Sequence, residues 1–313
     1  MITVEDALSH LFALAKPVET ERVGLAQAAG RVLAEDAIAQ RDQPPFAASA
    51  MDGYAVKGPV NGGETYTVIG EAAAGTAFSG TVGPNQAVRI FTGAPVPDGA
   101  DTVVIQEDIS RDGGRITVTG NRHGDNIRPA GADFKVGQSL QAPRRLTASD
   151  VALLASMNIP EVTVARKPDI AVISTGNELV MPGETPGPDQ IIASNTFGLA
   201  AMLRESGARV RVLPIARDTL QSLEQAFSLA EGADVVVTIG GASVGDHDLV
   251  AQAAEKHGIQ RQFYKVAMRP GKPLMAGRLG DAMMIGLPGN PVSAMVCGKI
   301  FLTPVIRALQ GLP

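Results

Sequence analysis

Four loops of this sequence combine glycine with polar or charged side chains. Three of them directly follow predicted strands and the fourth precedes one: 175–178, 240–248, 286–291 and 269–273. Glycine lets the backbone approach a ligand closely, and the free N–H groups at the start of a following helix carry about half a positive charge. The loops therefore predict a binding site for phosphate or another oxyanion.

The same loops carry both cations and acids. Arg269 and Lys272 lie in a stretch stiffened by prolines, while Glu178 and Asp248 bring carboxylates to two of the glycine loops. A carboxylate beside a bound phosphate is unfavourable unless a hard cation such as Mg²⁺ bridges the two. We therefore expect a Mg²⁺ site. Each loop taken alone could equally be a structural turn, and Asp218 could equally be the N-cap of the helix expected over 219–230.

One segment also matches the nucleophile elbow of serine hydrolases. Residues 241–245 read Gly-Ala-Ser-Val-Gly, between a predicted strand and a predicted helix. Only His247 and His257 follow Ser243, and a helix rising 1.5 Å per residue carries His257 about 20 Å away. A catalytic triad cannot close, so Ser243 is interpreted as a hydroxyl donor to an oxyanion.

The elements that position these loops alternate between strand and helix. This alternation predicts parallel strands joined by right-handed helical crossovers. In open sheets of this kind, ligands bind beyond the carboxyl ends of the strands, where the loops lie. Asn290 is a good N-cap and Pro291 a good first residue for the last helix. The expected strands are 169–174, 208–215, 234–239, 273–278 and 282–285, and the expected helices are 196–205, 220–230, 249–257 and 291–309.

The first half of the sequence has a different texture. Thr3 and Asp6 match the two ends of a capping box before an amphipathic helix, and a second helix is expected over 151–157. Short β-like runs broken by glycine and proline lie between these helices, at 65–71, 87–91, 102–107 and 115–118.

These patterns predict an α/β protein with a second, smaller domain. The expected division is a helical linker and dimerisation region over 1–39 and 144–166, a mostly-β domain over 40–143, and an α/β domain over 167–313. The apolar stripes of the two flanking helices belong to neither compact domain, so we expect a homodimer interface to cover them.

Composition excludes several classes of protein. A formal charge of -5 among 313 residues, with 4% aromatics and no Trp, argues against nucleic acid as a partner. The single cysteine, Cys297, excludes an intrachain disulfide framework and a Cys-rich zinc site. The acidic N-terminus is unlike a signal peptide, and no stretch is expected to span a bilayer, so the expected location is the cytoplasm.

Seven segments, in order, resemble those of the MoeA family, the molybdopterin molybdenumtransferases related to the E domain of gephyrin. One of them contains the run Met51-Asp52-Gly53-Tyr54, and the resemblance covers nearly the whole chain. Members usually continue into a C-terminal β-barrel domain, whereas this sequence ends at Pro313. The segments are 49–55, 91–97, 127–133, 174–179, 240–248, 268–273 and 286–291.

The resemblance implies a reaction and a shared site. Molybdate would react with adenylyl-molybdopterin on a MogA-like three-layer α/β domain, with Mg²⁺ as cofactor and AMP as a product. The enzyme would be an elongated homodimer whose site combines the α/β domain of one subunit with the β domain of the other. The implied catalytic residues and metal ligands are Asp52, Glu178 and Asp248. The substrate-binding candidates are Thr92, Arg128, Asp133, Gly240, Gly241, Ser243, Gly245, Arg269, Lys272, Pro288, Gly289, Asn290, Pro291 and Ser293.

Two alternative functions are distinguished by sequence features. A protein that binds molybdopterin without transferring metal has no need for carboxylates in its anion loops. A MogA-like molybdopterin adenylyltransferase lacks the β domain that contains Asp52. Both features favour the transferase.

Overall fold

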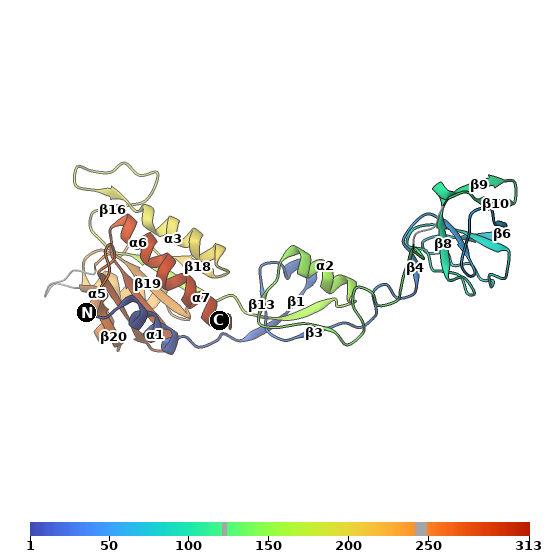
Figure 1. The fold of residues 1–313 in the computed structure, drawn as a ribbon. Helices are drawn as coiled ribbons and strands as arrows, with labels where there is room; N and C mark the ends of the chain where they lie inside the picture. Colours follow the sequence, from blue (N-terminus) through green and yellow to red (C-terminus); the bar gives the residue numbers. More distant parts are fainter. Residues whose placement is uncertain (121–123, 242–248) are drawn as a thin grey trace. The chain divides into compact units, whose positions relative to one another are not determined.

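The computed structural model describes residues 1–120, 124–241 and 249–313. Its contacts divide the chain into two compact units (Figure 1). The α/β unit comprises Met1–Glu35, Ala142–Ala148 and Glu161–Pro313, and the β unit comprises Asp36–Gln141 and Ser149–Pro160.

A six-stranded sheet in the order β18-β15-β19-β22-β21-β20 forms the centre of the α/β unit. The first four strands are parallel, as expected, whereas β21 and β20 run antiparallel to their neighbours. The 273–278 run therefore turns directly back along β22 without a helical crossover. The strands are β15 (Asp169–Ser174), β18 (Arg209–Val212), β19 (Val235–Ile239), β20 (Gln260–Lys265), β21 (Pro273–Leu279) and β22 (Ala282–Leu287).

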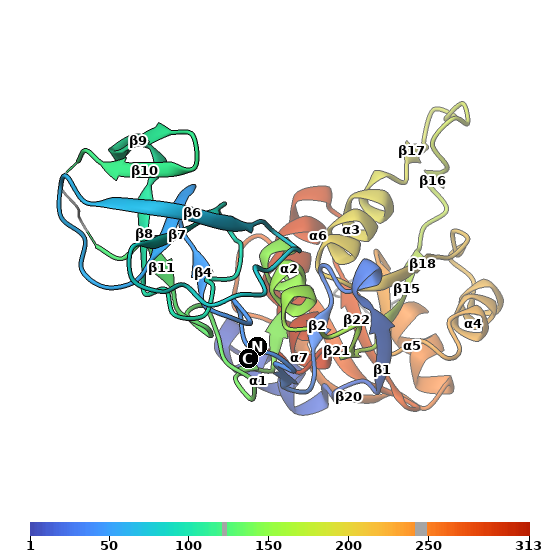
Figure 2. The same cartoon turned by 90° about the vertical axis from the view of Figure 1, so that its right-hand side faces the viewer.

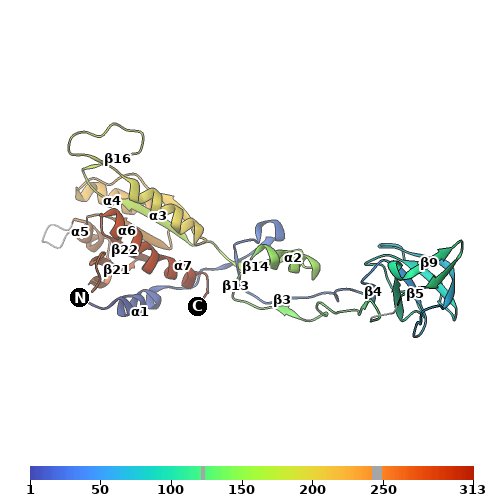
Figure 3. The same ribbon diagram turned by 45° about the horizontal axis from the view of Figure 1, so that its top comes forward.

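Helices cover both faces of this sheet, which confirms the three-layer prediction (Figure 3). Val172, Val237 and Ile285 face one core, and Ile173, Val236 and Met284 face the other, because successive strand residues alternate between faces. The first face is covered by α1 (Val4–Leu14), α3 (Ser194–Glu205), α6 (Pro291–Cys297) and α7 (Thr303–Leu309), and the second by α4 (Leu220–Leu229) and α5 (Leu249–Lys256).

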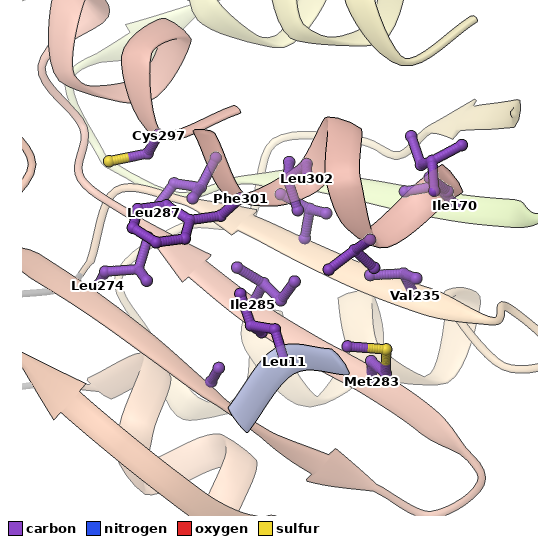
Figure 4. Close-up of a cluster of buried hydrophobic side chains, with 14 of the residues drawn as sticks. Leu11, Ile170, Val235, Leu274, Met283, Ile285, Leu287, Cys297, Phe301 and Leu302 are labelled. Atoms are coloured by element: carbon purple, nitrogen blue, oxygen red, sulfur yellow. The ribbon is translucent and has the colours of Figure 1, made fainter. Parts of the chain in front are cut away.

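The N-terminal helix α1 is part of this core. Its predicted capping box is present: the Thr3 hydroxyl accepts from the Asp6 N–H, and the Asp6 carboxylate accepts from the Thr3 N–H. Leu11 is fully buried, and Figure 4 shows it in the same cluster as Ile285 and Phe301. The expectation that a dimer interface covers the apolar stripe of α1 was wrong, because the stripe packs within its own α/β unit.

The last helix is nearly continuous from Pro291 to Leu309, with a π-helical turn at Gly298–Leu302 between α6 and α7. Asn290 caps it as predicted, and its side-chain oxygen accepts from the Ser293 N–H at 3.1 Å. Contrary to expectation, this helix is long and apolar enough to span a bilayer, with a mean hydropathy of 1.6 over the best window. Half of that window is buried, and Phe301 and Ile306 are fully enclosed in the α/β core. The apolar composition is that of a core helix.

A small antiparallel sheet, in the order β1-β14-β2-β13, also belongs to the α/β unit. It pairs residues from both sides of the long β-unit segment: Leu33 lies opposite both Arg144 and Val164. The strands are β1 (Thr20–Gly24), β2 (Val32–Leu33), β13 (Arg144–Arg145) and β14 (Glu161–Ala165), and a 3₁₀ turn, η1 (Leu25–Gln27), follows β1.

The β unit contains a six-stranded mixed sheet in the order β8-β5-β7-β6-β10-β9 (Figure 2). Tyr54 and Val56 of β5 face one apolar cluster, and Ala55 faces another, as strand alternation requires. Two short two-stranded sheets, β11-β4 and β12-β3, complete the unit. The strands are β3 (Ala37–Ile38), β4 (Ala48–Ser49), β5 (Gly53–Val56), β6 (Thr65–Ala72), β7 (Gln86–Ile90), β8 (Thr102–Ile105), β9 (Ile109–Asp112), β10 (Arg115–Val118), β11 (Ile127–Arg128) and β12 (Ser139–Leu140). The helical elements are η2 (Gln106–Asp108) and α2 (Ala148–Ser156).

Candidate active site

A small cavity of about 110 Å³ lies at the carboxyl ends of β15, β19 and β22. The predicted site residues Glu178, Gly240, Gly289 and Pro291 all line it. Its remaining lining residues come from the end of β15, from β19, from the connection between β15 and α3 and from the first turn of α3: Ser174, Thr175, Leu179, Ile191, Ile192, Ala193, Ser194, Asn195, Thr196 and Ile239. The fold thus brings together three of the glycine loops identified in the sequence.

Gly240 is required where two of these loops meet. Its φ is +90°, a left-handed conformation that side chains disfavour, and a Cβ atom placed on it would lie 2.8 Å from the carbonyl oxygen of Thr175. A Cβ on Gly289 would lie 3.4 Å from the Cα of Gly240. A Cβ atom on Gly241, whose φ is +68°, would clash with the Val250 side chain. The absence of side chains here allows the backbones of the loops to pack against one another and to line the cavity.

The loop that carries Glu178 is fixed by residues that the sequence analysis missed. Arg217 Nη1 donates to the carbonyl oxygens of Gly176, Asn177 and Leu179 at 3.3, 3.2 and 2.9 Å. The arginine precedes α4, so only the three-dimensional fold brings it to this loop.

Asp218 holds the same loop in place. Its carboxylate accepts from the Asn177 N–H, and its own N–H donates to the Asn177 side-chain oxygen, both at 3.1 Å. The suggested N-cap role for Asp218 was wrong: Thr219 caps α4 by accepting from the Ser222 N–H.

The loop over 286–291 is held in place by a residue of α3. Asn195 Nδ2 donates to the carbonyl oxygen of Gly289 at 2.7 Å, a contact between residues 94 positions apart. Ser293 is buried, and both its N–H and its hydroxyl contact the Asn290 side chain, so Ser293 completes the helix cap. Pro288 is buried and Gly289 is exposed. The Asn290 side-chain oxygen and the Ser293 N–H and hydroxyl are thus engaged with one another.

The exposed cations Arg269 and Lys272 lie in the loop before β21. Because β21 runs antiparallel to β22, this loop lies at the same edge of the sheet as the end of β22. Neither residue lines the 110 Å³ cavity. The candidates Ser243, Gly245 and Asp248 lie outside the described residues.

In the β unit, Asp52 is held by the backbone and side chain of Thr92. The Thr92 N–H and hydroxyl both donate to Asp52 Oδ1, at 2.8 and 2.7 Å. These two hydrogen bonds hold the pKa of Asp52 below its ordinary value, with a smaller contribution from the charge of Arg89. Asp52 is therefore ionised at neutral pH.

Arg128 and Asp133 form an ion pair through Arg128 Nη2 and Asp133 Oδ1. Arg128 belongs to β11, which pairs with β4, so it lies opposite Ala48, close in sequence to Asp52. Arg128 and Thr92 both line a second cavity, of about 650 Å³, in the β unit. The structure therefore brings Asp52, Thr92, Arg128 and Asp133 together within one unit.

Two family models match successive parts of this chain. Residues 2–158 match the MoeA N-terminal region (domain I and II), and residues 171–308 match a probable molybdopterin binding domain. The chain belongs to the MoeA family.

Curated relatives agree with this membership. The molybdopterin molybdenumtransferase of Haemophilus influenzae is 39% identical over 99% of this chain and 78% of its own length. The molybdopterin molybdenumtransferase 2 of Mycobacterium tuberculosis H37Rv is 38% identical over 93% of this chain and 75% of its own length. The crystal structure of the molybdopterin biosynthesis MoeA protein from Pyrococcus horikoshii, 33% identical, superposes with a TM-score of 0.84 over 99% of this chain and 80% of that one. MoeA membership is thus supported by sequence and by fold.

The MoeA residues expected to bind metal are carboxylates, which are the ligands that Mg²⁺ prefers. Asp52 fits this role because it is ionised and its Oδ2 makes no hydrogen bond within the described residues. Glu178 is exposed and lines the cavity. Within the described ranges, no group of three potential metal ligands lies close enough together to hold an ion.

Proposed function

We propose that this MoeA-family chain is a molybdopterin molybdenumtransferase that reacts molybdate with adenylyl-molybdopterin and releases AMP. The observation that carries the proposal is the presence, on one chain, of both the MoeA N-terminal region and the molybdopterin-binding domain. An adenylyltransferase of the MogA type would need only the second part. Soluble substrates of this kind and a single free cysteine suit a reaction in the cytoplasm.

In this proposal, the cavity at the edge of the α/β sheet holds the phosphate-bearing part of the substrate. Gly240 and Gly289 add no side chain to the cavity that they line. The Gly240 N–H already donates to the Leu287 carbonyl oxygen at 3.0 Å, so the exposed Gly289 is the backbone that a phosphate oxygen can approach. Arg269 and Lys272 would neutralise oxyanion charge at the same edge, as cations suited to phosphate or molybdate. Ser243 and Gly245 would contribute donors from the neighbouring loop.

We further propose that Asp52, Glu178 and Asp248 bind Mg²⁺. The bound ion would neutralise the charge that develops as the link to AMP breaks. The Thr92 hydrogen bonds keep Asp52 deprotonated and orient its carboxylate, so that Oδ2 stays available. Because Asp52 belongs to one unit and Glu178 to the other, we propose a homodimer in which the β unit of one subunit completes the site of its partner.

The direct test is AMP release. Purified protein is mixed with adenylyl-molybdopterin, Mg²⁺ and molybdate, and AMP is quantified over time. We expect release that requires both molybdate and Mg²⁺. Tight substrate binding without AMP release would support the binding-only alternative instead.

A second experiment separates a chemical role for Asp248 from a capping role. Asp248→Asn keeps side-chain size and hydrogen-bonding capacity but removes the charge. We expect the variant to bind the substrate and to keep nearly the wild-type melting temperature, while Mg²⁺-dependent AMP release falls by orders of magnitude. Release near the wild-type rate would show that Asp248 is not a metal ligand.

A further inference from the structure

The 650 Å³ cavity of the β unit has an unusual charge balance for an acidic protein. Two arginines, Arg41 and Arg128, line it, and none of the described residues in its wall is an acid. Arg128 is paired with Asp133, and the Asp52 carboxylate accepts from Thr92, so Arg41 is the cation of this lining that no described acid neutralises. Pockets that bind small molecules commonly measure about 300–1,000 Å³, and this one falls within that range. The unpaired guanidinium of Arg41 favours an anionic ligand.

Several of the donors around this cavity are already used within the β unit. The Thr92 N–H and hydroxyl donate to Asp52, the Gly93 N–H donates to the Ser49 carbonyl oxygen at 2.8 Å, and the Ala50 N–H donates to the Asn126 carbonyl oxygen at 2.9 Å. The Ser49 hydroxyl donates to the Met51 carbonyl oxygen at 2.6 Å. These groups are therefore not available to a ligand.

Arg41 has its donors available. Arg128 is engaged by Asp133, whereas Arg41 makes no hydrogen bond or ion pair with any residue in the described part of the chain. A guanidinium group carries five N–H donors in a planar fork that matches two oxygens of a phosphate. Arg41 is therefore the strongest anion-binding group of the cavity.

Part of the cavity lining is apolar. Phe46 lines it with 41% of its surface exposed, next to Pro44 and Pro45. An exposed aromatic face offers a stacking surface for a heterocyclic base. The neighbouring prolines restrict the backbone and limit the movement of this wall.

We propose that Arg41 and Phe46 form a binding site for a flat heterocycle that carries a phosphate group, with Phe46 stacking on the ring and Arg41 binding the phosphate. This inference rests on the proposed function, because the adenylate and pterin parts of adenylyl-molybdopterin both have this chemistry. It adds substrate-positioning roles for two residues that the sequence analysis did not select.

The test is calorimetric binding to the full chain, with AMP as the main probe. Adenosine lacks the phosphate of AMP, ribose 5-phosphate lacks the ring, and neopterin monophosphate replaces adenine by a pterin. The variants are Arg41→Gln and Phe46→Leu. Arg115→Gln, an exposed arginine on β10 outside the cavity, is the matched control.

We expect Arg41→Gln to weaken AMP binding at least tenfold and to leave adenosine binding unchanged. Phe46→Leu should weaken AMP and adenosine alike and leave ribose 5-phosphate unchanged, and Arg115→Gln should change nothing. Arg41-dependent binding of neopterin monophosphate in place of AMP would also support the site and assign it to the pterin. The proposed site would be overturned if Arg41→Gln binds AMP as tightly as the wild type does. It would also be overturned if the wild type binds neither AMP nor neopterin monophosphate at millimolar concentration. Failure of wild-type AMP release would refute the transferase while leaving these binding results to be judged separately.

Discussion

Gly240→Ala should disrupt the cavity at the sheet edge by adding a single carbon. At φ +90° the new Cβ would lie 2.8 Å from the carbonyl oxygen of Thr175 and 3.2 Å from its hydroxyl oxygen. The left-handed conformation costs about 1–2 kcal/mol for a residue with a side chain. Overpacking against a backbone atom, which cannot rotate away, costs about a further 1–3 kcal/mol. The free energy of unfolding should therefore fall by about 2–5 kcal/mol.

Gly232→Ala is the matched control. Gly232 precedes the same strand and has φ +77°, but a Cβ there would meet nothing within 4 Å. It should cost only the conformational part, about 1–2 kcal/mol. Urea unfolding followed by far-ultraviolet circular dichroism measures both variants, because most of the helices belong to the α/β unit. Substrate affinity, measured at a temperature where both variants are folded, should fall for Gly240→Ala alone. Equal destabilisation of the two variants, with unchanged substrate affinity, would refute the close-approach argument.

Three further changes test other parts of the structure. Leu11→Ala should lower the free energy of unfolding by about 3–5 kcal/mol, whereas Phe12→Ala, at a side chain 45% exposed, should cost far less. If Leu11→Ala instead dissociates a dimer without loss of stability, α1 is an interface helix. Thr92→Val removes one of the hydrogen bonds that lower the pKa of Asp52, so the pH below which activity is lost should rise. Thr92→Ser keeps the hydroxyl and should restore the wild-type pH dependence. If the acid limb of the pH–rate profile does not move in Thr92→Val, Asp52 is not a required anion. Arg217→Ala removes three hydrogen bonds to the Glu178 loop and should raise KM for adenylyl-molybdopterin several-fold, and an unchanged KM would mean that the loop holds its conformation without them.

Local sequence patterns predicted the elements well where the pattern itself carries the physical cause. The Thr3 capping box and the Asn290 cap depend on residues three positions apart, and both form as predicted. The strands that lead into the glycine loops contain buried, β-branched runs. Ligands of parallel sheets bind beyond the carboxyl ends of the strands, so the sequence predicted that these loops meet at one edge, where the shared cavity lies.

Contacts between distant residues could not be predicted in this way. The packing of α1 depends on a core formed by residues more than 150 positions away, and its amphipathic stripe is the same whether a sheet or a second subunit covers it. Arg217 and Asn195 have no local pattern that distinguishes them from solvated residues, because their partners are backbone carbonyls brought close by the fold. Arg41 was missed for a related reason: its importance comes from the partners it lacks.

The pairing of the first residues with the last third of the chain has a consequence for the order of events during synthesis. The Ile2 N–H bonds to the Lys265 carbonyl oxygen, and Leu11 packs against a cluster that includes Phe301 and Leu309. A chain grows from its N-terminus, and domains generally fold as units as they emerge. The β unit, whose residues all lie between Asp36 and Pro160, can fold while α1 still has nothing to pack against. The apolar face of α1 therefore stays uncovered until more than 250 further residues have been made. During that interval, a chaperone that binds short amphipathic helices would protect this face from aggregation.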